Sequence, residues 1–279
     1  MVATRDTAQH VAPQISVNGA IHYEWSGRGQ PVLLLHGIGS GLRIWDPLLP
    51  WLMPHHDVIA VGLAGHGESP LLPDDGPPPD RWIRARAGGL PGRAGHRDGA
   101  PGGQLARRVD GAGAGETGLA RWVVCLSPAG LWRDGVPSYD VALFRVTRGL
   151  ARRLLPAAPA LLATPVGRTL VLAHLYGRPW KLPPGAALEA MRTFAHMPAF
   201  EPTFRATIRE SFSGGRQIQV PVTVAWGGRD CVLLPGLARL REELPPQTRW
   251  LTLPGCGHVP TYDDPDLVAR TILSGMHPT

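Results

Sequence analysis

The sequence has almost no lysine, few cysteines and no long hydrophobic run. Lys181 is the single lysine among 28 lysine and arginine residues, and the others are all arginine. No window of about 18 uninterrupted apolar residues occurs, so no membrane span is predicted. The first thirty residues also lack the basic start and apolar stretch of a signal peptide. We therefore expect a cytoplasmic protein without a membrane partner.

Cysteine occurs only as Cys125, Cys231 and Cys256. An odd number without metal-type spacing argues against a disulfide framework and against a metal site. Free cysteine is most often a small buried hydrophobic residue, so we expect three reduced thiols in ordinary packing positions. Neither a metal nor a cofactor is predicted.

The positive charge is unevenly distributed along the chain. The net charge is +6, and the segment 81–121 carries eight arginines against three acidic residues, a balance of +5. Aromatic side chains occur only near the two ends of this segment, and no helix-turn-helix or zinc pattern accompanies it. A nucleic-acid partner is therefore not expected. We expect a small-molecule substrate, and we make no prediction of the oligomeric state.

The first seventy residues alternate between strand and helix patterns. The stretch 15–25 alternates around Asn18-Gly19, which is typical of two short strands joined by a tight turn. A continuous apolar run in 31–41 predicts a strand buried on both faces, and 42–52 has apolar residues at helical spacing. Another buried strand followed by a glycine-rich loop is predicted in 56–69. This order predicts an α/β fold with a mostly parallel, doubly wound sheet.

The alternation of strand and helix patterns resumes after residue 121. Val123–Leu126 is predicted to be a buried strand, and 132–212 is predicted to form several helices inserted between strands. Two further units of strand and loop follow in 220–230 and 249–258, and 263–276 is predicted to be the last helix.

Three strand ends carry residues suited to nucleophilic catalysis. His36 and Gly37 directly follow a predicted strand, where backbone N–H groups can point at a developing oxyanion. Asp230 and His258 follow two later strands. Because the carboxyl ends of parallel strands converge on one crevice, we expect this acid and this histidine to meet there. An aspartate that orients a general-base histidine is the second half of a catalytic triad.

Five motifs in this order resemble the α/β-hydrolase superfamily, in the branch with a His-Gly oxyanion motif and a helical cap. The resemblance covers residues from about 15 to 80 and from 122 to the end, and Gly62 stands where the family commonly has an acid. It implies an α/β-hydrolase fold in which 1–131 and 216–279 form the core and 132–215 the cap. It also implies that His258 is the general base, Asp230 its partner, and Ile38 N–H with Gly37 the oxyanion hole. The motifs are VLLLHGIGS, VGLAGHGES, LSPAGLW, VPVTVAWGGRD and GCGHVPTYDDPDLV.

The nucleophile of such an enzyme is not found. The family places it in the elbow G-x-S-x-G, between the glycine loop near residue 67 and the strand at 123. No serine, cysteine or aspartate of the chain has glycine both two before and two after it. Ser40, Ser69 and Ser127 lie near strand ends but outside this motif, and His66 is interpreted as structural. The interval 81–121 holds eleven glycines without hydrophobic period, so it is predicted to be poorly ordered.

The composition of 81–121 leads to a hypothesis about its origin. GC-rich DNA read in the wrong frame yields Gly, Arg, Ala and Pro without period, and the bias against lysine indicates such DNA. Allowed codons for Gly102–Arg107, GGT GGG CAA CTC GCT CGG, spell V-G-N-S-L-G when read one nucleotide later. Leu90–His96 similarly permits F-L-D-A-L-G-I. We hypothesise two compensating frame changes, near 76–84 and 119–122, that replaced the nucleophile unit.

Three functional readings remain open. The first is a serine hydrolase of esters or related acyl substrates. The second is a non-catalytic, defective member of the family. The third is an epoxide hydrolase or dehalogenase with an elbow aspartate, although no G-x-D-x-G occurs. We expect that the chain descends from a serine hydrolase. We also expect that the chain as printed is non-catalytic.

Overall fold

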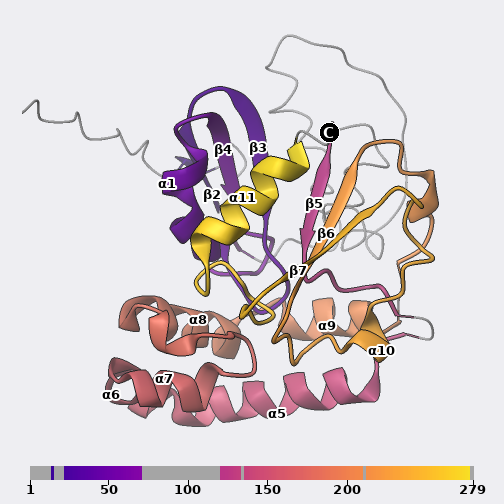
Figure 1. Ribbon diagram of the computed structural model, residues 1–279. Helices are drawn as coiled ribbons and strands as arrows, with labels where there is room; N and C mark the ends of the chain where they lie inside the picture. Colours follow the sequence, from indigo (N-terminus) through magenta and orange to yellow (C-terminus); the bar gives the residue numbers. More distant parts are fainter. Residues whose placement is uncertain (1–13, 16–21, 71–119, 133–134, 210–211, 277–279) are drawn as a thin grey trace, which may run out of the picture.

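The computed structural model describes residues 14–15, 22–70, 120–132, 135–209 and 212–276. It has two groups of strands with helices packed around them (Figure 1). Most of the suspect segment, 81–119, lies outside the described residues. No helix in the described ranges is long and apolar enough to cross a bilayer.

The first sheet has four strands in the order β1-β2-β4-β3. They are β1 (Gln14–Ile15), β2 (His22–Gly27), β3 (Gln30–Leu35) and β4 (His56–Val61). β2 pairs antiparallel with β1 and β4, whereas β3 and β4 are parallel. The predicted buried strands are therefore confirmed at β3 and β4, where Val32 and Val58 face each other and are almost fully buried.

The segment between β3 and β4 differs from its prediction. It forms a 3-10 helix, η1 (Leu42–Leu48), followed by one turn of α-helix, α1 (Leu49–Leu52), instead of a single longer helix. Pro47 lies inside η1 and Pro50 lies in the first turn of α1. Because proline lacks an N–H donor and clashes with the preceding turn, the two prolines prevent a continuous α-helix.

The second sheet is entirely parallel. Its order is β5 (Val123–Leu126), β6 (Val222–Gly227) and β7 (Arg249–Leu253), and every residue of β6 is buried. Among the described strands, β3 pairs only with β4 and β5 only with β6. The last helix, α11 (Pro265–Met276), packs against β5 and β6 and also against η1 and α1. One apolar core therefore joins the two sheets.

Helices fill the chain between β5 and β6. They form a layer at the end of the strands toward which the arrow of β5 points (Figure 1). Four phenylalanine rings pack together inside this layer, and the Arg148 guanidinium donates to the carbonyls of Phe194 and Met197. The elements are α5 (Ser138–Leu154), η3 (Leu155–Ala157), α6 (Ala158–Ala163), α7 (Pro165–Leu172), η4 (Pro179–Lys181), α8 (Pro184–His196) and α9 (Phe200–Arg209); η5 (Gly215–Gln217) precedes β6 and α10 (Pro235–Ala238) follows it.

Gly275 of α11 lies close against the second sheet. A Cβ there would lie 2.5 Å from Val124 Cγ2 and 3.2 Å from Thr223 Oγ1. We expect Gly275→Ala to lower the free energy of unfolding by about 1–3 kcal/mol, because overpacking displaces the helix from the sheet. Gly149→Ala in α5 is the matched control, since its Cβ would meet nothing within 4 Å. Urea unfolding of both variants checks this, and equal stabilities would contradict the tight packing of α11.

Candidate active site

Asp230 and His258 meet at the carboxyl ends of neighbouring parallel strands. Asp230 follows β6, His258 follows β7, and the two strands are paired in register. His258 Nδ1 lies 3.2 Å from Asp230 Oδ2. The Asp230 side chain is 0% exposed, whereas that of His258 is 20% exposed. The structure therefore brings together the two residues that the sequence analysis paired.

Backbone donors hold the Asp230 carboxylate in place. Its Oδ1 accepts hydrogen bonds from the N–H groups of Val232, at 2.9 Å, and Leu233, at 3.1 Å. Burial alone would raise the pKa of Asp230, but His258 and these two N–H groups outweigh it and lower the pKa below its usual value. Asp230 is therefore ionised near neutral pH and accepts a proton from neither solvent nor His258. The other carboxylate oxygen, Oδ2, faces Nδ1 of the imidazole ring and orients it.

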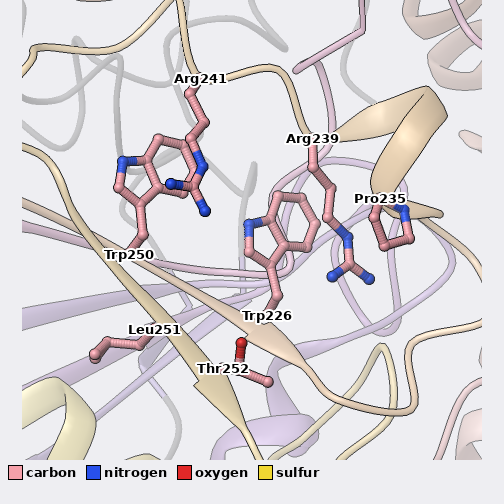
Figure 2. Close-up of a pocket in the computed structure, with 7 residues that line it drawn as sticks. All are labelled: Trp226, Pro235, Arg239, Arg241, Trp250, Leu251 and Thr252. Atoms are coloured by element: carbon pink, nitrogen blue, oxygen red, sulfur yellow. The ribbon is translucent and has the colours of Figure 1, made fainter.

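Arg239 supplies a cation near the same carboxylate. One guanidinium nitrogen lies 3.8 Å from Asp230 Oδ2, and Nε donates to Leu233 O at 2.8 Å. The guanidinium carbon lies 4.6 Å from the centre of the Trp226 ring. Figure 2 shows these two side chains in a pocket of about 260 Å³, which is also lined by Arg241 and Trp250. Arg239 thus connects this pocket to Asp230.

Close backbone packing fixes the loop that carries His258. Gly227, at the end of β6, lies against Gly257 so tightly that a Cβ on it would overlap the Gly257 carbonyl. A Cβ on Gly257 would lie 2.5 Å from Gly177 N. Only glycine fits at these positions, because any side chain would push the loop away from the strand.

Asp263 ties this loop to the helical layer. Its carboxylate accepts hydrogen bonds from Gly177 N at 2.8 Å, Gly257 N at 2.7 Å and Arg178 N at 2.6 Å. The residue is 0% exposed. Asp263 therefore holds together the chain after α7 and the residue that precedes His258.

The predicted oxyanion residues follow β3. His36 is buried, its Nδ1 lies 2.9 Å from Gly37 O, and its Nε2 accepts from Leu63 N at 3.0 Å. Burial, helped by the nearby His66 ring, lowers the pKa of His36 to about 3. His36 is therefore a neutral structural residue that holds the turn. Among the described residues, the Ile38 N–H is not a donor in any backbone hydrogen bond outside the helices and strands.

Apolar packing brings two segments together: the turn after β3 that carries Ile38 (the oxyanion turn) and the loop after β7 that carries His258 (the histidine loop). Ile38, Val259 and Tyr262 pack against one buried cluster that belongs to the helical layer. Gly39 has a φ of +80°, and a Cβ there would lie 2.8 Å from the Phe194 ring. Tyr262 O–H also donates to Arg43 O at 3.1 Å, which links the histidine loop to η1. The two halves of the predicted site thus share one set of neighbours.

Ser69 and Ser127, which lie near strand ends, differ in their surroundings. Ser69 Oγ accepts from His22 N at 2.9 Å and donates to Gly62 O at 2.7 Å, so its hydroxyl is used within the fold. Ser127 is buried and forms the bend after β5 with a φ of +46°. It is the only non-glycine residue with positive φ in the described chain, a conformation that is uncommon for serine, and its buried Oγ has no hydrogen-bond partner among the described residues.

Sequence reasoning missed three residues that surround the predicted pair. They are Arg239 and Asp263, described above, and Asp140 in the first turn of α5. Asp140 and Arg239 lie outside the five motifs, and Asp263 lies inside the last motif, which was interpreted only through His258; each of the three interacts with a residue at least 9 positions away in the chain. The carboxylates at 263 and 264 were read only as a helix start, a role that Asp264 does have through its bond to Leu267 N.

Comparisons with known proteins agree on the type of fold. No family model matches the chain. A segment of 62 residues is 37% identical to (E)-2-((N-methylformamido)methylene)succinate hydrolase of Acinetobacter baylyi, covering 22% of this chain and 24% of that protein. Pimeloyl-[acyl-carrier protein] methyl ester esterase of Nitrosomonas europaea is 26% identical over 260 residues, 88% of this chain and 96% of its own length. The first alignment thus spans only about a quarter of that curated relative.

Solved structures cover nearly the whole chain at low identity. An esterase from Exiguobacterium antarcticum has a TM-score of 0.65 and 17% identity, covering 94% of this chain and 97% of that one. The Cif epoxide hydrolase from Acinetobacter nosocomialis has the same TM-score and 16% identity, covering 96% and 90%. The chain therefore has the α/β-hydrolase fold, which confirms the predicted fold class.

The three bonds to Asp263 lead to a stability prediction. Asp263→Asn keeps the shape but replaces one acceptor oxygen with an NH2 group that faces N–H donors. We expect a loss of about 2–3 kcal/mol in the free energy of unfolding, since buried donors become unsatisfied. Asp266→Asn, which breaks a surface pair with Arg270, is the control and should cost less than about 0.5 kcal/mol. Similar losses for both variants in urea unfolding would refute the role of Asp263.

His36 predicts a dependence of stability on pH. Its pKa falls from 6.5 to about 3 on folding, so the unfolded chain binds more protons between these values. The contribution of His36 to the free energy of unfolding is therefore fully present above pH 6.5, and it is lost as the pH falls toward 3. We expect His36→Gln to reduce the loss of unfolding free energy between pH 7 and pH 4 by about 1–3 kcal/mol. Urea unfolding at the two pH values measures this, and an unchanged loss would count against a neutral, buried His36.

Proposed function

We propose that this chain derives from a serine hydrolase of esters or related acyl substrates, and that as printed it does not perform acyl transfer. The hydrogen bond between buried Asp230 and partly exposed His258 supports the proposed descent from a serine hydrolase. The sequence contains no G-x-S-x-G, G-x-C-x-G or G-x-D-x-G, and this supports the proposed lack of acyl transfer. The relatives named as esterases and hydrolases support an ester substrate class.

Each retained residue has a defined part in the ancestral reaction. With Nδ1 held by Asp230, His258 would present Nε2 as the base that takes the nucleophile's proton and later returns it to the leaving group. The ionised Asp230 would stabilise the imidazolium that forms between these two steps. The Ile38 N–H, with the backbone at Gly37, would bind the oxyanion. Water would then resolve the acyl-enzyme.

The missing part is the nucleophile unit itself. The described edges of β3 and β5 are each paired on one side only, and α11 spans both sheets. This arrangement supports a place for one further strand between them, the strand from which the elbow would rise. The chain that connects β4 to β5 is the one whose sequence lacks period. We infer that compensating frame changes near 76–84 and 119–122 replaced that strand, its elbow and its helix.

The helices between β5 and β6 are proposed to act as a cap. They occupy much of the segment 132–215, and α8 packs its Phe194 ring against the oxyanion turn. A small acyl substrate would then lie between this layer and the strand ends, in contact with apolar side chains. The core would consist of 1–131 and 216–279.

A fluorophosphonate probe tests the proposal because it labels only activated nucleophiles. We expect no covalent labelling of the chain as printed. A second chain, expressed from the coding DNA with one corrective base change in each of the two windows, should be labelled at its elbow serine. In that chain His258→Asn and Asp230→Asn should each slow labelling by about 10³-fold or more.

Matched variants make the outcome decisive. Elbow Ser→Ala in the restored chain should abolish labelling, and Asp266→Asn should leave it unchanged. Labelling of the printed chain would overturn the claim of inactivity and would locate the nucleophile by peptide mapping. A folded restored chain that stays unlabelled would overturn the claim of ancestry.

A further inference from the structure

Asp140 is a buried carboxyl group that the proposed reaction does not use. It lies in the first turn of α5 and is only 2% exposed. Neither carboxyl oxygen has a hydrogen-bond partner among the described residues. Leaving a buried carboxyl without partners is costly, so natural folds seldom keep one unless it interacts with something.

Direct contacts place the first turn of α5 beside the Asp230 loop. Tyr139 O–H donates to Cys231 O at 2.7 Å, one residue after Asp230. Leu143 and Phe144, in the next turn, pack against the cluster that holds Val232 and Leu233. The turn that carries Asp140 is therefore fixed to the same loop that supplies two hydrogen bonds to Asp230.

Burial and the charges of His258 and Asp230 together set the pKa of Asp140. Burial raises the pKa of Asp140 to about 6, the His258 charge opposes this rise, and the Asp230 charge adds to it. Asp140 therefore loses its proton in a pH range where histidine side chains commonly titrate. A carboxylate formed there adds a second negative charge to the surroundings of the imidazole ring.

We propose that Asp140 is a second carboxyl partner of His258, a positioning residue that controls from α5 how strongly the imidazole ring holds its proton. The inference rests on the proposed role of His258 as the base. When Asp140 is ionised it stabilises the imidazolium and strengthens the base. When Asp140 is protonated, Asp230 alone supports the ring.

Other charged and titratable groups surround this pair. Tyr139 shares the first turn of α5, while Cys231 and Arg239 belong to the chain after Asp230. His174, after α7, is close enough for its charge to interact with that of His258, and burial lowers the pKa of His174 so that it stays neutral near pH 7. Among the described carboxyl groups, Asp140 and Asp230 are those whose pKa the His258 charge lowers, which makes Asp140 the group to test.

The ring of His258 can be titrated by NMR in the full chain, without a substrate or a nucleophile. We expect the wild-type titration to be broadened, with a Hill coefficient below 1, because protonation of either group disfavours protonation of the other. In Asp140→Asn the curve should sharpen, and its midpoint should move to lower pH by about half a unit to one unit. Asp140→Glu, which keeps the charge, should restore most of the wild-type curve.

Two further measurements separate this role from a structural one. Asp266→Asn, a surface control, should leave the His258 curve unchanged. If Asp140→Asn alters only the unfolding temperature and leaves that curve unchanged, the proposal is overturned. Should Asp140→Asn fail to fold, the carboxyl carbon of Asp140 in the wild type replaces it. That carbon should titrate near pH 6 and move to higher pH in His258→Gln, and titration near pH 4 in both proteins would overturn the proposal.

Failure of this inference is distinct from failure of the proposed function. The NMR titration requires only a folded chain in which His258 and Asp140 keep their surroundings. Fluorophosphonate labelling requires a nucleophile. An unlabelled restored chain with a coupled titration would leave Asp140 as a partner of a histidine that is not a catalytic base.

Discussion

The buried carboxylate of Asp230 is the constraint around which the site is built. A charge removed from water must be compensated, and here two backbone N–H groups, one imidazole and one guanidinium do so. These partners come from the strand end itself, the loop after the next strand and the chain beyond α10. Because each must be in place for the charge to be tolerated, the carboxylate fixes the relative positions of the ends of β6 and β7 and of the chain beyond α10.

The rest of the histidine loop depends on contacts too close for side chains. Gly227, Gly257 and Gly177 stack backbone against backbone, and Asp263 accepts the N–H groups that this packing would otherwise leave unpaired. The apolar core beneath the site continues from one sheet to the other through α11. Among the described residues, burial in that shared core thus holds the two sheets together.

Much of this was predictable from the sequence, and the exceptions have physical reasons. Continuous apolar runs ending in small residues correctly identified β3, β4, β6 and β7, and therefore the meeting of Asp230 with His258. The helix over 42–52 was mispredicted because apolar spacing was weighed above Pro47 and Pro50. Asp140, Arg239 and Asp263 were missed because their roles arise only when distant segments pack together. No local pattern distinguishes such carboxylates and guanidinium groups from solvated ones.

We propose that this chain has kept the base, the acid and the oxyanion turn of a hydrolase site and has lost its nucleophile unit to a change of reading frame. Sequencing the coding DNA over codons 76 to 122 tests this most directly. The account predicts that the neighbouring frame spells a strand, a G-x-S-x-G elbow and a helix across codons 81 to 121. A neighbouring frame without that elbow would contradict it.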